Sequence, residues 1–150
     1  MPNYPLNIVS FAGSLRDGSV SRLLLKSCLS VAPREMMITE LVIGEIPLFN
    51  ADLESQGSPN SVLAFKRALS LADGLLIVTP EYNHGIPAVT KNLIDWASRK
   101  NDNQGNVLSE LPINFIGISG GSGGTGAMVR SQLRQVLVYP GAIPMPKGDI

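Results

Sequence analysis

Short apolar segments alternate along the whole chain with segments whose apolar residues recur every three or four positions. The short segments are rich in β-branched side chains, as strands buried on both faces are. They predict strands over residues 7–12, 36–42, 74–79, 113–119 and 142–145. The segments between them predict amphipathic helices, so strands and helices are expected to alternate.

The expected helices begin at recognisable capping signals. Ser19 stands before the first, Ser58-Pro59 begins the second, which is expected to reach Leu71, and Pro87 suits the first turn of the third. Each expected helix has an apolar stripe, and a fourth helix is expected after residue 126. The stripes are, for the first helix, Val20, Leu23, Leu24, Cys28 and Leu29; for the second, Val62, Phe65 and Leu69; for the third, Val89, Leu93, Trp96 and Ala97; and for the fourth, Met128, Val129, Leu133, Val136 and Leu137. Residues 44–57 are expected to form a long polar connection.

This alternation predicts an α/β fold, a doubly wound parallel sheet with helices on both faces. Right-handed crossovers then place every strand-to-helix loop along one edge of the sheet. In a five-stranded sheet of order 2-1-3-4-5, a ligand lies outside the carboxyl ends of strands one and three. Three loops meet there, over residues 13–19, 80–87 and 120–126.

Length, charge and cysteine content narrow the class of protein. The 150 residues suit one domain over 1–150. Twelve basic and twelve acidic side chains cancel without a block of like charge, which argues against nucleic-acid and acidic-membrane surfaces. Cys28 stands alone, is expected in the core, and supports neither a disulfide framework nor a thiolate metal site. No apolar run approaches about 18 residues and no leader pattern begins the chain, so a cytoplasmic protein is expected.

The first loop, residues 13–19, resembles an anion cradle. Ser14 and Ser19 offer hydroxyls, and the helix that begins near Ser19 points its positive end inward. Arg16 adds a full charge with planar donors that suit a phosphate. This loop contains neither a Walker A sequence nor a G-x-G-x-x-G sequence, since Gly13 is followed by Ser14 and Leu15, so one monophosphate fits better than a pyrophosphate. The alternative is a simple glycine-rich turn.

The second loop, residues 80–87, offers peptide groups and side chains to a flat heterocycle. Tyr82 could lie beside the ring plane, the backbone around Glu81 and Asn83 could bond its polar edge, and Gly85 permits close approach. Glu81 could instead hold its own loop or pair at a subunit contact. His84, the single histidine, could contact a second substrate, but it makes no metal site and no Ser-His-acid triad.

The third loop brings backbone donors and no bulk to the same edge. An aromatic ring could lie over residues 119–126, and the alternative is a flexible turn. No carboxylate pair, metal-ligand cluster or nucleophile–base pair stands out in the sequence, so no catalytic side chain is assigned. An enzyme built this way would take its chemistry from a bound cofactor.

Several segments, in chain order, resemble the NADPH-dependent FMN reductase family, the flavodoxin-like group that includes quinone, chromate and azo-dye reductases. They are GSLR with GS at 13–16 and 18–19, PLFN at 47–50, ADG at 72–74, TPEYNHGIP at 79–87, KNLIDW at 91–96, and GGSGG at 120–124 with Arg130, Leu133 and Arg134. The likeness covers essentially all 150 residues, and TPEYNHGIP is its most specific part.

The resemblance implies a non-covalent FMN. The positions that match the family's phosphate site are Ser14, Arg16, Ser19 and Ser21. Those that match its isoalloxazine site are Pro80, Glu81, Tyr82 and Asn83, with Ser119 and Gly120 beneath or beside the ring. Substrates are expected to contact Tyr82, Asn83, His84 and Gly85.

The activity that the resemblance implies is an FMN-dependent NAD(P)H oxidoreductase. Hydride would pass from NADPH or NADH to FMN and then to a quinone-like acceptor, in a ping-pong exchange at one flavin face. A flavodoxin-like electron carrier is the first alternative, although the balanced charge does not supply the acidic docking surface it needs. A flavin-free remnant or interaction domain is the second alternative.

The resemblance also implies a homodimer or homotetramer, with the helix after TPEYNHGIP near the interface. Ile94 and Trp96 are candidates for that contact, and core packing explains Trp96 equally well. Family members usually continue past the fifth strand into a last helix, whereas this sequence ends at Ile150. Apolar surface is therefore expected to be exposed near strands one and five, whether the short end is natural or a truncation.

Overall fold

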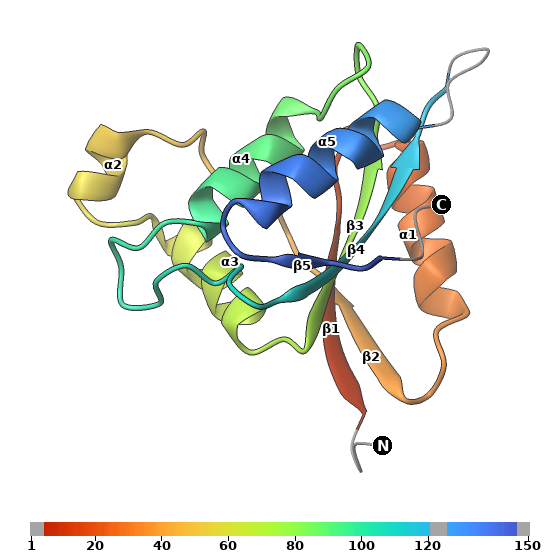
Figure 1. Cartoon of the computed structure of the whole chain (residues 1–150), viewed down its shortest axis with the longest axis horizontal. Coiled ribbons are helices and arrows are strands. Elements are labelled where there is room, and N and C mark those ends of the chain that lie inside the picture. Colours follow the sequence, from red (N-terminus) through yellow and green to blue (C-terminus); the bar gives the residue numbers. More distant parts are fainter. Residues whose placement is uncertain (1–4, 121–125, 147–150) are drawn as a thin grey trace.

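A parallel sheet with helices on both faces is the framework of the molecule (Figure 1). The computed structural model describes residues 5–120 and 126–146. Its elements in chain order are β1 (Leu6–Ala12), α1 (Val20–Ser30), β2 (Met36–Glu40), α2 (Ala51–Ser55), α3 (Asn60–Ser70), β3 (Gly74–Pro80), α4 (Ala88–Ala97), β4 (Pro112–Ile118), α5 (Ala127–Val138) and β5 (Ile143–Pro144).

The strands that the structure describes pair in the order β2-β1-β3-β4-β5, and every pair is parallel. In the centre of the sheet Val9 pairs with Thr39 on one side and Leu75 on the other. β3 and β4 continue in register to their last residues, where Pro80 pairs with Ile118. The predicted fold class and strand order are confirmed.

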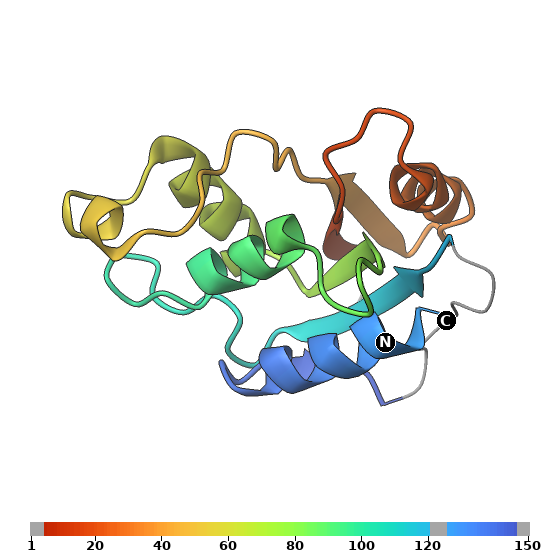
Figure 2. The same cartoon turned by 90° about the horizontal axis from the view of Figure 1, so that it is seen from above.

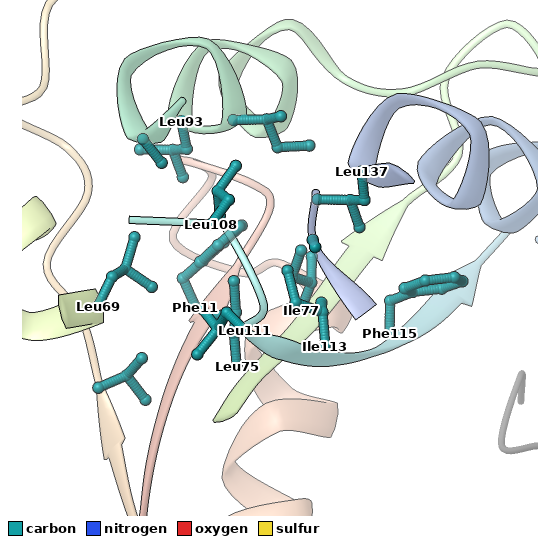
Figure 3. Close-up of a cluster of buried hydrophobic side chains, with 14 of the residues drawn as sticks. Phe11, Leu69, Leu75, Ile77, Leu93, Leu108, Leu111, Ile113, Phe115 and Leu137 are labelled. Atoms are coloured by element: carbon teal, nitrogen blue, oxygen red, sulfur yellow. The ribbon is translucent and has the colours of Figure 1, made fainter. Parts of the chain in front are cut away.

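The two faces of the sheet are covered unequally. α1 packs on one face, over β1 and β3, and α3, α4 and α5 cover the other (Figures 1 and 2). Figure 3 shows the main core on the three-helix side, where Phe11, Ile77 and Phe115 from adjacent strands face the helices. The opposite face holds a smaller cluster of Ala12, Leu25 and Val78.

Apolar surface is expected near strands one and five, and the structure shows it there in part and also on β3 and β4. Ile143 in β5 is 52% exposed, as expected. The carboxyl half of β1 is buried, because α1 lies across it. Leu6 and Ile8 in the amino half of β1 are half-buried, and on the α1 face Leu76, Ile116 and Ile118 of β3 and β4 are half-covered as well.

The predicted buried face of α1 is wrong at two positions. Val20 and Leu23 are 57% and 60% exposed, whereas Leu25 is fully buried. The buried side of the helix follows Ser21 and Leu25, one turn apart, because Ser21 turns inward to the loop before the helix. Cys28, expected in the core, is half-buried.

The connection over 44–57 contains a short helix, α2, that was not expected. Its first turn is capped by Asn50, whose side chain accepts a hydrogen bond of 2.8 Å from the Asp52 amide. Asn50 followed by acidic residues in the first turn was a local signal for this helix. Elsewhere the boundaries differ by one to three residues; for example, Pro59 and Pro87 occupy N-cap positions and helices α3 and α4 begin one residue later.

Candidate functional site

The carboxyl ends of β1, β3 and β4 bring the expected loops to one edge of the sheet, at the top of Figure 1. The Gly13 amide donates to the Val78 carbonyl at 2.8 Å, and the Glu81 amide donates to the Ile118 carbonyl at 2.7 Å. The Tyr82 hydroxyl lies 3.5 Å from Ser14 Oγ. The first and second loops therefore touch at the switch point between β1 and β3.

Three buried hydroxyls lie at the amino end of α1. Ser14, Ser19 and Ser21 are each almost completely buried, and Ser19 Oγ lies 2.7 Å from Ser21 Oγ. Ser19 occupies the N-cap position, but no side chain caps the helix. Arg16 stands exposed on the same loop, where its amide donates to Ser14 Oγ at 3.4 Å. Uncapped amides, hydroxyls and a cation together suit a phosphate.

Gly13 fits this loop closely against α4. A Cβ at residue 13 would lie closer than 3.0 Å to the hydroxyl oxygens of both Thr79 and Thr90. These two threonines form a buried pair with their oxygens 3.0 Å apart. Residue 13 must therefore be glycine, because there is no space for a side chain. The Thr79–Thr90 pair packs directly against the phosphate loop.

The second loop is a tight hairpin. The Tyr82 amide donates to the Gly85 carbonyl at 3.2 Å, and the Gly85 amide donates back to the Tyr82 carbonyl at 2.9 Å. Asn83 and His84 between them have φ values of 51° and 57°. Two left-handed residues in succession define a two-residue turn of the type found in β-hairpins. Tyr82, Asn83 and His84 are all exposed at its end.

The side chain of Glu81 is engaged by the chain itself. Its Oε2 accepts a hydrogen bond of 3.0 Å from the Val129 amide in the first turn of α5, and its Oε1 lies 3.3 Å from His84 Nδ1. The carboxylate is 4% exposed. This is the geometry of a residue that holds its own loop, and because the Glu81 amide is bonded to the Ile118 carbonyl, Glu81 has its backbone carbonyl to offer a ligand.

The start of the third loop lies next to the hairpin. Ser119 and Gly120 follow β4 directly; Ser119 is half-buried, and a Cβ added at Gly120 would meet nothing within 4 Å. Residues 121–125, which form most of this predicted loop, lie outside the described residues. The chain is described again from Gly126, whose φ of 67° and close approach to Gly117 both require glycine.

Sequence reasoning missed Gln132, which contacts the hairpin from α5. Its Nε2 donates to the His84 carbonyl at 3.0 Å, and its Oε1 accepts from the Ile86 amide at 3.2 Å. Gln132 lies more than 40 residues from the hairpin in the sequence, on a helix whose apolar stripe gave no reason to single it out. No local signal pointed to it.

The carboxyl groups with shifted pKa values lie away from this edge. The Arg99 guanidinium, hydrogen-bonded to Glu54 at 2.8 and 2.9 Å, lowers the pKa of that carboxyl against the effect of burial. Burial raises the pKa of Asp102, but the buried Lys66 ammonium and two backbone amides outweigh it and hold the pKa below its ordinary value. Both pairs join helices to connections, which is a structural role.

Two further observations concern classes of site. Within residues 5–120 and 126–146 no three His, Cys, Asp or Glu side chains gather as they would around a metal ion. No helix of this part of the chain is long and apolar enough to cross a membrane.

The sequence of the chain matches the family model described as NADPH-dependent FMN reductase over residues 6–150. The chain belongs to this family. FMN and NADPH or NADH, the cofactors expected from the sequence, are the cofactors of the NADPH-dependent FMN reductases. The predicted class of enzyme, a flavin-dependent oxidoreductase, is confirmed.

Curated relatives from this family cover nearly the whole chain. An NAD(P)H-dependent FMN reductase of Pseudomonas aeruginosa is 37% identical over 145 residues, which span 97% of this chain and 76% of the relative. A quinone reductase of Escherichia coli K12 is 39% identical over 150 residues, spanning 96% and 76%. A 2-hydroxy-1,4-benzoquinone reductase of a Burkholderia species is 42% identical over 145 residues, spanning 97% and 77%.

Two solved structures share the fold of this chain. FerB, a flavoenzyme NAD(P)H:(acceptor) oxidoreductase from Paracoccus denitrificans, superposes with a TM-score of 0.85 at 33% identity, over 97% of this chain and 79% of FerB. A WrbA-like flavodoxin from Agrobacterium tumefaciens superposes with a TM-score of 0.60 at 14% identity, over 92% and 75%, and shows the fold alone. The flavodoxin-like arrangement predicted from the sequence is confirmed.

Proposed function

We propose that this reductase transfers electrons from NADPH or NADH to a quinone through FMN bound at the edge formed by β1, β3 and β4. The observation that carries the proposal is the contact of the two loops, Ser14 Oγ with the Tyr82 hydroxyl, at the switch point of the sheet. The proposed phosphate loop and the hairpin that carries Tyr82 therefore lie side by side at one site, as the two ends of an FMN molecule require. Quinones are named as substrates because several relatives are quinone reductases.

The phosphate of FMN would be held at the amino end of α1. Ser14, Ser19 and Ser21 supply buried hydroxyls, and the uncapped first turn supplies amides. Arg16 would swing its guanidinium onto the phosphate from the surface of the loop, since its side chain is exposed. The close packing of Gly13 on Thr79 and Thr90 fixes the start of this loop against α4.

The isoalloxazine would lie between the hairpin and the end of β4. Pro80 and the peptide groups of Glu81 border it on one side, and Tyr82 and Asn83 extend past them. Ser119 and Gly120 follow the neighbouring strand, where Gly120 leaves open space. Hydride acceptance and release is the chemistry that bound FMN supplies. The residues named here would orient it and exclude water from one of its faces.

Donor and acceptor would use the same place in turn. Tyr82, Asn83, His84 and Gly85 form the hairpin end that both would meet, and Tyr82, Asn83 and His84 are exposed there. A shared place predicts ping-pong kinetics, with parallel lines in double-reciprocal plots at several quinone concentrations. Intersecting lines would contradict a shared place.

A visible absorption spectrum of the purified protein, before and after anaerobic NADPH, tests the proposal. We expect flavin bands, present as isolated or after adding FMN, that bleach with NADPH or NADH and return when a quinone is added. Bands that persist would favour the flavodoxin-like electron carrier. A protein that takes up no FMN in excess would favour a flavin-free interaction domain.

A homodimer or homotetramer acting in the cytoplasm, where NAD(P)H is formed, is part of the same proposal. A groove of about 1150 Å³ runs between the outer sides of α4 and α5 and could receive a second copy. Ile94 and the exposed Tyr139 border it. Trp96 is fully buried and donates its indole N–H to the Pro47 carbonyl at 2.8 Å, so core packing accounts for it.

Sedimentation equilibrium of the wild type and of Tyr139→Asp tests this assembly. We expect a dimer or tetramer for the wild type and weaker association for the variant, because the added charge would be buried at the contact. A wild type that stays monomeric at every concentration would contradict it.

A further inference from the structure

The hairpin of the second loop holds two residues in an unfavourable backbone conformation. Asn83 and His84 both have positive φ, at 51° and 57°. Asparagine and histidine adopt this region more often than most residues, but at a cost that glycine does not have. Such a turn persists only where the surrounding structure holds it in place. The neighbours of the turn therefore decide where its end lies.

Helix α5 provides that support through one amide side chain. Gln132 Nε2 donates to the His84 carbonyl at 3.0 Å, and Gln132 Oε1 accepts from the Ile86 amide at 3.2 Å. The two bonds fall on the second turn residue and on Ile86, in the segment that leaves the turn. The Gln132 side chain thus holds the turn in one orientation, because it makes hydrogen bonds to the backbone on both sides of Gly85.

The approach of Gln132 depends on Gly85. A Cβ added at Gly85 would lie 3.3 Å from Gln132 Oε1, so any larger residue would crowd the amide. One helical turn earlier, the Val129 amide binds the Glu81 carboxylate at 3.0 Å. Residues 129 and 132 share a face of α5, and from it the helix holds both the beginning and the end of the hairpin.

We propose that Gln132 is a positioning residue that sets how closely the Asn83–His84 turn approaches the flavin edge and thereby which planar acceptors fit. This rests on the proposed function. Gln132 binds only the backbone of the hairpin, so its effect on a quinone passes through the exposed side chains of Asn83 and His84. The role needs one donor and one acceptor, which glutamine has and glutamate or methionine lacks.

The test compares Gln132→Met, which loses both bonds, with Gln132→Glu, which keeps only the acceptor. Gln56→Met is the matched control, since Gln56 is exposed at the end of α2, away from the hairpin. The first measurement is amide hydrogen exchange without added FMN. We expect exchange at Ile86 to rise about tenfold in Gln132→Met, while the control and the melting temperature stay unchanged. Unchanged exchange at Ile86 would overturn the proposal.

The second measurement is steady-state kinetics of the FMN-loaded proteins with benzoquinone and a bulkier naphthoquinone. We expect the KM for the quinone to rise about fivefold to tenfold in Gln132→Met, with kcat and FMN affinity changed less than about twofold. Equal loss of FMN, stability and activity would show a merely structural role and overturn it. Should Gln132→Met not fold, Gln132→Ala, which also loses both bonds, carries the same comparison at Ile86.

The outcomes separate this proposal from the proposed function. A wild type that reduces no quinone would remove the proposed function and, with it, the effect on acceptors. The exchange experiment needs no flavin, so it still decides whether Gln132 holds the turn. A released turn with an unaltered KM for both quinones would overturn the positioning role while leaving the reductase activity in place.

Discussion

Gly13 has room for a hydrogen atom and nothing larger, because the Thr79 and Thr90 hydroxyls lie where a side chain would begin. We expect Gly13→Ala to cost about 1–3 kcal/mol of the free energy of unfolding. FMN binding should weaken as well, since the phosphate loop must move away from α4. Urea unfolding and FMN titration measure the two effects.

Gly44→Ala is the control for this substitution, because a Cβ there would meet nothing within 4 Å. We expect it to change the free energy of unfolding by less than about 0.5 kcal/mol. A Gly13→Ala protein as stable as the Gly44→Ala protein would mean that the threonine pair yields, and that Gly13 is not a packing requirement.

Arg16 carries the one full positive charge among the proposed phosphate residues. We expect Arg16→Ala to weaken FMN binding by about 1.5–3 kcal/mol, the scale for a hydrogen bond to a charged group. Fluorescence quenching of added FMN measures the dissociation constant. Arg34→Ala is the control, since Arg34 is highly exposed and pairs only with its neighbour Glu35. An unchanged constant in Arg16→Ala would remove Arg16 from the phosphate site.

Among single residues, the sequence allowed prediction of those whose partners lie nearby in the chain. Ser14, Arg16 and Ser19 stand within six residues of one another, so a common role as a phosphate site could be predicted from composition and spacing. Gln132 and Thr90 could not be found this way, because each acts on a segment that only the fold brings near. Glu81 lies in a recognisable motif, but its partner, the Val129 amide, is also distant.

Two buried ion pairs tie helices to connections. Lys66 of α3 is completely buried, with Nζ 2.6 Å from Asp102 Oδ2 and 2.9 Å from the Arg99 carbonyl. Arg99, just after α4, binds Glu54 of α2 with two hydrogen bonds. These charges join α2 and the first part of the connection after α4 to the molecule, while Val107, Leu108 and Leu111 anchor the second part of that connection in the core.

The lowered pKa values of Asp102 and Glu54 make stability fall in acid. The unfolded chain binds protons at these carboxyl groups at higher pH than the folded chain does, so their contribution is complete above the ordinary pKa values. We expect the free energy of unfolding to decrease as the pH falls below about 5. Urea unfolding at several pH values measures this slope.

Asp102→Ala tests the origin of that slope. At pH 7 we expect a loss of about 3 kcal/mol, because the buried Lys66 ammonium keeps its charge without its carboxylate. The slope in acid should become shallower, since one of the two groups is gone. Glu35→Gln, at an exposed pair, is the control. A slope that Asp102→Ala leaves unaltered would assign acid sensitivity to other carboxyl groups.

Elements were predictable where burial is nearly complete. β3 and β4 lie in the interior of the sheet and read as apolar runs, and their predicted ends differ from the observed ones by a residue. α2 has five residues, and Leu53 is its single large apolar side chain. So short a helix shows no repeat of apolar positions from which it could be predicted. The face of α1 was misjudged because Ser21, a polar residue, turns toward the interior.

The whole molecule has one well-covered face of the sheet and one partly covered face. Ile113 and Ile116 stand on β4 and point to opposite faces; Ile113 is completely buried and Ile116 half-buried. We expect Ile113→Ala to cost about 3–4 kcal/mol of the free energy of unfolding and Ile116→Ala about 1–2 kcal/mol. Equal costs would mean that something covers Ile116 in solution.

The arrangement of the sheet followed from general rules of chain connection. Alternating elements and right-handed crossovers were enough to predict a parallel sheet with its strand-to-helix loops at one edge, and the order 2-1-3-4-5 came with the flavodoxin-like resemblance. The contacts that fix those loops are the packing of Gly13 on Thr90 of α4 and the hydrogen bonds of Val129 and Gln132 of α5 to the hairpin. They follow from the exact placement of two helices, which hydrophobic periodicity does not determine.

The capping of two helices gives the site a direction. The positive pole of α5 is already matched by an internal anion, the Glu81 carboxylate on the Val129 amide. The pole of α1 has no capping side chain and keeps its attraction for an anion from outside. A ligand with one phosphate and one uncharged end can therefore be seated in a single sense, and a second anionic end finds no counterpart at α5. The charges at the two helix ends therefore select the orientation of the bound ligand before any specific contact forms.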